Sequence, residues 1–243
     1  MSLGTIIEAG NTAAVYEWED GKILKLFHQG YPKEAVENEF HNAMAIRDMN
    51  FAKPKAYEII SYEERDGIIY DRVDGEALLE WVMKTGDVQK CAVYMAELHK
   101  AILQNSISNV PNYKDFLKRH IPYKLLALDK KEEVLKMMEK LPDGNTLCHG
   151  DFHPGNILIS GENTYVIDFM NICHGDFLYD IARTVFLVEY TPVPAEADNR
   201  DMILALRKQL IDIYLEQMNV TREMLKDYLS VIIISRKGEC PNE

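Results

Sequence analysis

The first 70 residues contain short runs of apolar and β-branched residues, a pattern typical of β-strands. The runs predict two hairpins, formed by segments 12–18 with 22–27 and 56–61 with 67–71. Polar turns fall between the paired segments, at 19–21 and 63–66. Between the hairpins, Pro32 is placed to open a helix that ends near Asn50, because proline fits the first turn of a helix. This part of the chain therefore predicts a small antiparallel sheet with one helix.

Beyond Gly75 the apolar positions recur every three or four residues, which predicts amphipathic helices. Helices are predicted over 76–84, 88–105, 176–188, 197–218 and 221–235, with further helices before residue 141. Two strand-like runs, 157–160 and 165–168, interrupt the helical pattern. We therefore predict a bilobal α+β fold with its hinge near 72–75. Residues 1–73 would form a β-rich lobe, and residues 74–243 a larger, mostly helical lobe.

Composition narrows the class of protein. The 243 residues are 47% hydrophobic and 27% charged, which is ordinary for a globular protein with a sizeable core. The net charge of −12 disfavours a nucleic-acid partner, which needs a basic surface. No apolar run approaches the ~20 residues that cross a bilayer, and the N-terminus lacks a signal-peptide pattern. With four cysteines and no C-x-x-C pair, we expect a cytoplasmic protein without a membrane partner.

One segment carries the candidate chemistry, the run H-G-D-F-H-P-G-N at 149–156. Asn156 lies five positions after Asp151, and Asp168 lies seventeen positions after it. Asp151 can accept the proton of a hydroxyl group. Asp168 and Asn156 offer the hard oxygen ligands that Mg²⁺ prefers. Protein kinases use the same order and spacing for phosphoryl transfer, which needs positioning and charge neutralisation more than covalent chemistry.

The two histidines of this segment leave another interpretation open. His149 and His153 are four residues apart, a spacing that on a helix suggests a metal pair. With Asp151 they would make a metal-dependent hydrolase, which should contain zinc or manganese. Gly150 and Pro154 argue against a helix here, because both residues disfavour helical backbone. An irregular loop between strands is the better prediction.

The segment resembles the catalytic loop of the aminoglycoside phosphotransferase and choline kinase-like family, which reads H-G-D-x-x-x-x-N. Gly150 stands where protein kinases have arginine, and the run G-D-F-L-Y-D-I-A-R at 175–183 is similar to a second motif of the family. The resemblance implies a protein-kinase-like fold whose first lobe binds the nucleotide. It also implies a small-molecule kinase that transfers the γ-phosphate of ATP, or of GTP, to a hydroxyl group. Mg²⁺ would be the cofactor and Asp151 the catalytic base.

By the same resemblance, residues of the first lobe contact the nucleotide. Lys25 would hold the phosphates, and Glu39 would pair with this lysine, with Glu37 as the alternative. A loop containing a single glycine would cover the phosphates, through Gly10, Asn11 and Thr12. The segment before the lobe boundary would contact the purine, through Tyr70 and the backbone of Asp71 and Val73.

In the second lobe, the resemblance implies that His149 and Asp180 support the catalytic loop. His153 and Asp176 are candidates for contact with the acceptor. Segment 168–201 holds seven acidic side chains and two basic ones, a surplus that would attract a cationic alcohol. We expect a small polar hydroxyl compound as substrate. The sequence leaves open which compound it is, the choice between ATP and GTP, and the oligomeric state.

Two further functions stay open as alternatives. The first is a kinase acting on protein side chains, although Met170 follows Phe169 in place of the expected glycine and no A-P-E motif occurs. The second is a regulatory module that binds nucleotide without turnover. Such a module would typically have lost one of the four chemically required residues, and all of them are present: Lys25, Asp151, Asn156 and Asp168.

Overall fold

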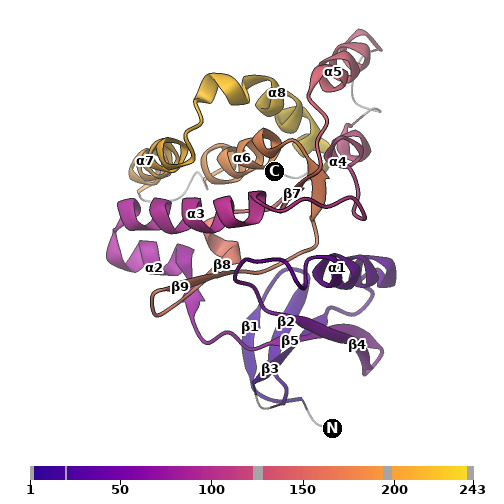
Figure 1. Cartoon of the computed structure of the whole chain (residues 1–243). Helices are drawn as coiled ribbons and strands as arrows, with labels where there is room; N and C mark the ends of the chain where they lie inside the picture. The colour runs from indigo at the N-terminus through magenta and orange to yellow at the C-terminus, as the bar shows by residue number, and fades with distance from the viewer. Residues whose placement is uncertain (1–2, 20, 123–127, 194–198, 240–243) are drawn as a thin grey trace.

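The computed structural model describes residues 3–19, 21–122, 128–193 and 199–239. It has two lobes, a β-rich lobe that contains the N-terminus and a larger helical lobe (Figure 1). The first lobe holds a five-stranded antiparallel sheet in the order β1-β2-β3-β5-β4. Its strands are β1 (Ile6–Ala9), β2 (Ala13–Glu17), β3 (Lys22–Phe27), β4 (Ala56–Tyr62) and β5 (Arg65–Asp71). Helix α1 (Lys33–Ala45) packs against β4 and β5.

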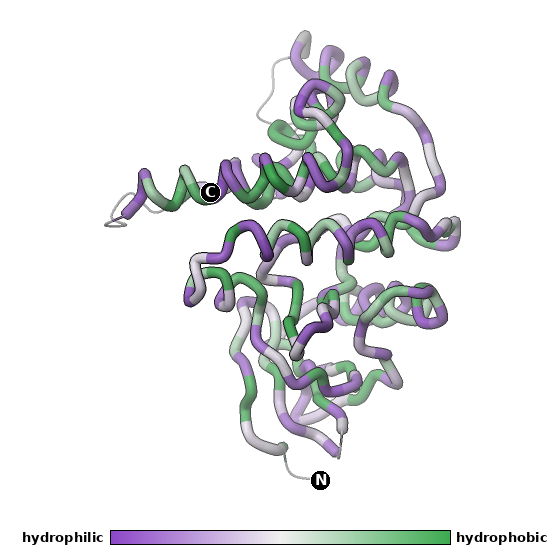
Figure 2. Tube along the Cα trace, turned by 60° about the vertical axis from the view of Figure 1, so that its left-hand side comes forward, coloured by the Kyte–Doolittle hydropathy of each residue, from purple (hydrophilic) through white to green (hydrophobic). Residues whose placement is uncertain are grey.

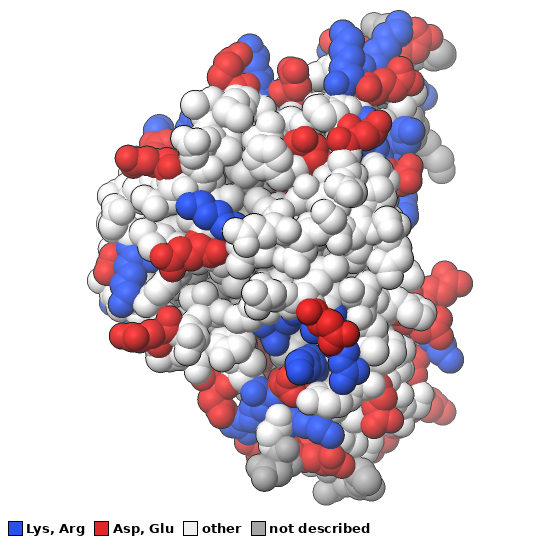
Figure 3. Space-filling model, in the orientation of Figure 1, with Lys and Arg blue, Asp and Glu red and all other residues white. Residues whose placement is uncertain are grey.

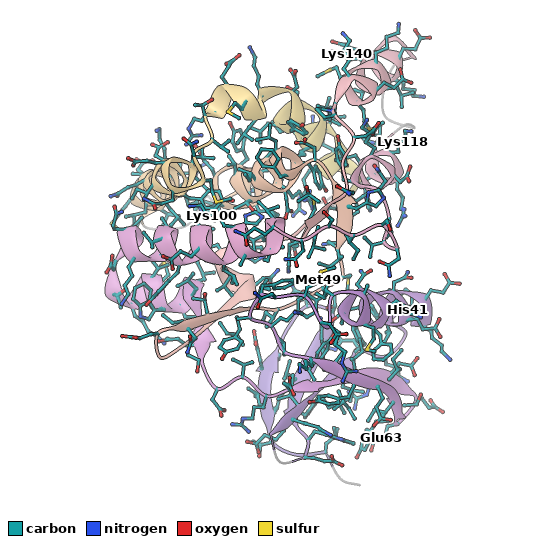
Figure 4. All side chains as sticks on the ribbon, viewed as in Figure 1. His41, Met49, Glu63, Lys100, Lys118 and Lys140 are labelled. Atoms are coloured by element: carbon teal, nitrogen blue, oxygen red, sulfur yellow. The ribbon has the colours of Figure 1, made fainter. Side chains whose placement is uncertain are left out.

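Both predicted hairpins are present, but strand β1 was not predicted. All four residues of β1 are exposed, so an apolar-polar alternation could not reveal it. Helix α1 ends at Ala45, earlier than the predicted residue 50, because the chain turns back at 46–50. The β4–β5 turn places Glu63 and Glu64 at positive φ (48° and 60°), as a tight two-residue hairpin turn requires. Side chains fill both lobes, and Figure 4 labels His41 on α1 and Glu63 in this turn.

The second lobe is built from helices around two small sheets. The helices are α2 (Leu78–Thr85), α3 (Val88–Leu103), α4 (Tyr113–His120), α5 (Leu128–Lys140), α6 (Phe177–Val185), α7 (Arg200–Met218) and α8 (Arg222–Glu239). One sheet pairs β7 (Thr146–Cys148) with β10 (Cys173–Gly175), and the other has the order β6 (Glu76–Ala77), β8 (Ile157–Ser160), β9 (Asn163–Val166). The bilobal α+β fold predicted from the sequence is confirmed. The predicted strand 165–168 ends at Val166, two residues before Asp168.

The core of the second lobe lies between α3, α6, α7 and α8, where α3 packs along α7 and α6 along α8. Apolar and polar positions alternate along these helices in Figure 2, as their amphipathic pattern requires. The predicted helix 176–188 is in two parts, α6 followed by a short π-helical turn at Phe186–Tyr190. Residues 197–198 of the predicted helix 197–218 lie outside the described residues. None of the helices in the described ranges is both long and apolar enough to cross a membrane.

Candidate active site

A cleft of about 600 Å³ lies between the lobes, and residues from both lobes line it. From the first lobe come Lys25 of β3, Glu39 of α1, the loop at 10–12 and the segment 70–75. From the second lobe come the catalytic loop, with Asp151, His153 and Asn156, and the segment 167–169. Residues more than 140 positions apart in the chain therefore share one cavity. The fold brings together every candidate residue for base, metal and phosphate contact that the sequence identified.

An ion-pair network connects the two lobes across this cleft. Lys25 Nζ lies 2.8 Å from Glu39 Oε1 and 3.3 Å from Asp168 Oδ1, and Tyr70 Oη donates to Glu39 Oε1 at 3.0 Å. Glu39 is 1% exposed, whereas the side chain of Glu37 is 45% exposed and faces Lys33 at 3.9 Å. The pairing partner of Lys25 is therefore Glu39. Burial opposes the charged form of Lys25, but the carboxylates of Glu39 and Asp168 outweigh it and raise the pKa of this lysine.

The catalytic loop fixes Asp151 and Asn156 relative to one another. Asn156 Nδ2 donates to the backbone carbonyl of Asp151 at 2.9 Å and to Asp151 Oδ2 at 3.2 Å. Because its amide nitrogen is used in this way, the Oδ1 atom of Asn156 remains as an acceptor. Pro154 and Gly155 close the loop as a single 3₁₀ turn, which ends at Asn156, one residue before β8 begins at Ile157.

Asp168 lies next to Asn156 because Ile167 N–H donates to the Asn156 carbonyl at 3.0 Å. Its backbone has φ = 66°, a left-handed conformation that is uncommon for a residue other than glycine. Asn42 of α1, which the sequence did not indicate, holds the following segment by donating to the carbonyl of Phe169 at 2.8 Å. Burial disfavours the charged carboxylate of Asp168, but Lys25 overcomes this and lowers its pKa. A carboxylate and an amide oxygen on neighbouring segments form a donor set that fits Mg²⁺ or another hard cation.

Asp180 of α6 is wholly buried directly beneath the catalytic loop. It accepts hydrogen bonds from the backbone N–H groups of His149 at 2.7 Å and Gly150 at 2.8 Å. His99 of α3 bonds the same carboxylate at 2.9 Å and contacts Tyr214 of α7 through its other nitrogen. These bonds outweigh the burial of Asp180 and lower its pKa. The sequence indicates that His99 packs inside the lobe, but it did not indicate the bond to Asp180 or the part played by Tyr214; a histidine on the buried face of a predicted helix was the signal for the first.

The histidines of the loop have different surroundings. His149 uses both ring nitrogens within the protein, toward the Ile167 carbonyl at 3.2 Å and the Asp151 N–H at 3.3 Å. His153 Nδ1 accepts from the Gly155 N–H at 3.1 Å, so the proton of the neutral ring is on Nε2. Nε2 has no partner within the described residues, and the side chain lines the cleft. His149, His153 and Asp151 therefore do not converge on a metal as the hydrolase interpretation requires, and no cluster of three such ligands occurs in the described residues.

The predicted phosphate loop joins β1 to β2. Gly10 N–H donates to the Ala13 carbonyl, and His28 Nε2 holds the Gly10 carbonyl at 2.9 Å. The backbone N–H groups of Asn11 and Thr12 have no hydrogen-bond partner within the described ranges. These two donors remain available for an anion.

At the predicted hinge, one backbone N–H group is hydrogen-bonded within the protein and another has no partner among the described residues. Asp71 N–H donates to the Lys55 carbonyl at 3.0 Å, and Asp71 lines the cleft. Val73 N–H has no partner among the described residues, and Val73 lines the cleft. Tyr70 is buried behind the cleft wall, where its hydroxyl holds Glu39.

Asp176 does not line the cleft. It caps α6 by accepting from Leu178 N–H and also accepts from Tyr228 Oη, both at 2.9 Å. Other acidic side chains of segment 168–201 also have partners within the protein. Glu189, for example, forms an ion pair with Arg222 at 2.8 Å. Asp201 is exposed, and Glu196 and Asp198 lie outside the described residues. On the face shown in Figure 3, acidic side chains lie beside basic ones around a mostly uncharged middle.

Comparison with known proteins supports the same fold. A family model described as the phosphotransferase enzyme family matches residues 4–205. No curated protein sequence matches the chain. Among solved structures, amicoumacin kinase hAmiN in complex with AMP-PNP, Ca²⁺ and Ami is 18% identical, with 96% of this chain and 80% of that chain covered and a TM-score of 0.62.

Two other solved structures show the same likeness. An aminoglycoside-3'-phosphotransferase of type VIII is 16% identical, with 96% and 93% of the two chains covered and a TM-score of 0.62. A choline/ethanolamine kinase family protein from Mesorhizobium loti is 11% identical, with 99% and 82% covered and a TM-score of 0.56. At such identities the likeness concerns the fold, and the protein-kinase-like architecture implied by the catalytic-loop motif is confirmed.

Proposed function

Because this chain belongs to the phosphotransferase enzyme family, we propose that it transfers the γ-phosphate of ATP to a hydroxyl group of a small polar molecule. The family membership confirms the resemblance drawn from the motifs at 149–156 and 175–183. The protein is thus an enzyme of the small-molecule kinase class. Its nucleotide, its metal and the roles of single residues are the parts that we propose.

The proposal is supported most by one arrangement. Asp151, Asn156 and Asp168 line the same cleft as Lys25, and Lys25 is held by Glu39 and Asp168. Phosphoryl transfer requires a cationic group and a metal near the phosphates, and a carboxylate near the acceptor hydroxyl. The cleft provides a candidate for each of these three groups.

We assign the following roles to the chain's own residues. Lys25 contacts the α- and β-phosphates, and the free N–H groups of Asn11 and Thr12 cover the phosphate chain. The purine lies against the 70–73 segment, where the Val73 N–H is available as donor. Asp151 orients the acceptor hydroxyl and takes its proton as the oxygen attacks. Asn156 holds Asp151 in place through its amide nitrogen.

Asp168 and the Oδ1 atom of Asn156 would hold Mg²⁺. When bound, this ion would neutralise charge on the β- and γ-phosphates. His153 presents an Nε2–H donor to the cleft, and we propose that it donates to an oxygen of the γ-phosphate or of the acceptor.

The acceptor is proposed by class. The solved structures similar to this chain include an amicoumacin kinase, aminoglycoside phosphotransferases and a choline/ethanolamine kinase family protein. Each of these names refers to an enzyme whose substrate is a small polar molecule. A cationic acceptor has limited support from the described residues, because four of the five described acids of segment 168–201 are engaged with other groups: Asp168, Asp176, Asp180 and Glu189.

The deciding experiment measures release of nucleoside diphosphate with a panel of hydroxyl compounds. The panel contains aminoglycosides, choline, homoserine and simple sugars, and it is run with ATP and with GTP in the presence of Mg²⁺. We expect one class of small molecule to stimulate release, and the Asp151→Asn variant to abolish the stimulation. Stimulation by a protein or peptide substrate alone would instead indicate a protein kinase. Tight nucleotide binding without turnover across the panel would favour a regulatory module.

A further inference from the structure

Arg183 of α6 is a fully buried cation that bonds the backbone of the catalytic loop. Its guanidinium Nε donates to the carbonyl of Gly150 at 3.0 Å, and its face lies 5.4 Å from the ring of Phe116 on α4. Its Nη2 forms an ion pair with Glu239 in the last turn of α8, whereas Nη1 has no hydrogen-bond partner in the described part of the chain. Glu239 is the carboxylate that forms an ion pair with this buried charge.

Gly150 is the residue that needs this support. It has φ = 75°, and a Cβ atom at this position would lie 2.3 Å from the Asn171 carbonyl oxygen, so only glycine fits. Its N–H is fixed by Asp180 and its carbonyl by Arg183. The carbonyl of Gly150 belongs to the peptide that leads directly into Asp151. A rotation of this peptide would therefore move the carboxylate that we assign as the base.

Glu239 sets the position of the Arg183 guanidinium. Its side chain is 14% exposed, and Arg236, one turn earlier on α8, lies 3.4 Å from its other oxygen. The end of α8 is itself held against α4, where Ser235 Oγ donates to the Leu117 carbonyl at 3.2 Å. If the Glu239 carboxylate is removed, the guanidinium loses its ion-pair partner while remaining buried.

We propose that Glu239 is a positioning residue for the phosphoryl-transfer reaction, which acts through Arg183 to hold the Gly150 peptide that leads into Asp151. The proposal rests on the proposed function, because turnover is its readout. It adds a contribution of the final helix to a site otherwise built from the inter-lobe cleft. The sequence motif at 175–183 contains Arg183 but gives no sign of its partner 56 residues downstream.

The test compares Glu239→Ala and Glu239→Gln with Glu223→Ala, a control on the same helix whose side chain is 83% exposed and lies 3.8 Å from Lys226. We expect Glu239→Ala to lower kcat by about 10- to 100-fold while the KM for ATP stays within about 2-fold, because the loop shifts and the nucleotide contacts do not. Glu239→Gln, which keeps a hydrogen-bond acceptor for Nη2, should recover most of this loss. Glu223→Ala should match the wild type. All values of kcat are referred to the concentration of nucleotide-binding sites, so that unfolded protein does not count.

A double-mutant cycle with Arg183→Met separates positioning from general stability. If Glu239 acts through Arg183, adding Glu239→Ala to Arg183→Met should change kcat by less than about 2-fold. An undiminished further loss in the double variant would overturn the proposal. So would a lower melting temperature of Glu239→Ala with an unchanged kcat per binding site, and this result decides the question even if Arg183→Met does not fold. Absence of turnover in the wild type would instead count against the proposed function.

Discussion

Replacement of Glu39 tests the ion-pair network that connects the two lobes. The carboxylate is 1% exposed and makes three close contacts with two partners: Lys25 Nζ at 2.8 and 3.0 Å from its two oxygens, and Tyr70 Oη at 3.0 Å. In Glu39→Ala, the ammonium of Lys25 loses its nearest counter-charge and the Tyr70 hydroxyl loses its acceptor. Both groups stay buried, so the change should lower the free energy of unfolding.

The size of this loss in stability depends on the ion pair that Lys25 keeps. Removing one partner of a buried ion pair costs about 3–5 kcal/mol. Asp168 Oδ1 remains 3.3 Å from Lys25 Nζ, so we expect the lower end of this range, about 3 kcal/mol. For a chain of this length, that corresponds to a decrease of roughly 6–12 °C in melting temperature. Glu39→Gln should cost less, because it keeps the volume and one acceptor but removes the charge.

The same variants should weaken nucleotide binding. Without Glu39, Lys25 moves toward Asp168 and away from the phosphates, so ATP affinity should fall by about 10-fold or more, which is about 1.4 kcal/mol. Thermal unfolding gives the stability and titration calorimetry gives the affinity. Glu37→Gln is the matched control, because Glu37 lies on the same helix with a half-exposed side chain and should change stability by less than about 0.5 kcal/mol.

The reasoning fails if Glu39→Ala and Glu37→Gln have the same melting temperature and the same ATP affinity. It also fails if Glu39→Ala loses stability but binds ATP as the wild type does. The second result would mean that Lys25 does not contact the phosphates, and that its ion pairs serve the fold alone.

Substitutions at four other residues test their individual roles. Asp151→Asn should lower kcat by about three orders of magnitude and leave the ATP Kd within about 2-fold, and an equal loss of binding in calorimetry would contradict the role of base. Asp168→Ala should weaken binding of Mg²⁺–ATP, and unchanged affinity would rule out its role in metal binding. His153→Asn keeps an acceptor that caps the Gly155 N–H but loses the Nε2–H donor, whereas His153→Gln keeps a donor without the cap. If the donor contributes to the reaction, steady-state kinetics should show a larger loss of kcat for His153→Asn than for His153→Gln. Asp180→Asn should be less stable at pH 7. Because the pKa of Asp180 is lowered in the folded state, its carboxylate stabilises the fold above its unfolded pKa of about 3.8. This stabilisation is lost as pH falls through the lower pKa of the folded state. The free energies of unfolding of the wild type and Asp180→Asn, measured with denaturant, should therefore converge in strong acid.

The catalytic loop could be predicted because its chemistry is local. The positions of Asp151, Asn156 and Asp168 follow from a fixed spacing, and each residue type has a chemical reason to be present. The choice between Glu39 and Glu37 could not be made in this way. It depends on which side of α1 faces Lys25, and that is set by how α1 packs on the sheet.

Contacts between residues that are far apart in the sequence could not be predicted from it either. His99 meets Asp180 across 81 residues, and Arg183 meets Glu239 across 56. The placement of Asp176 depended on the fold as well, because the residue caps α6 instead of facing the cleft. Strand β1 has no buried face, so its pairing with β2 is visible only once the sheet is assembled.

Asp168 has a positive φ value of 66°, and this has a practical consequence for protein engineering. A left-handed backbone costs a residue with a Cβ atom about 1–2 kcal/mol, a cost that glycine does not have. Glycine at this position would remove that backbone cost, but it would also remove the ion pair with Lys25. Libraries of thermostable variants should keep Asp168 unchanged, since any relief of the backbone here would accompany loss of the carboxylate proposed to hold the metal.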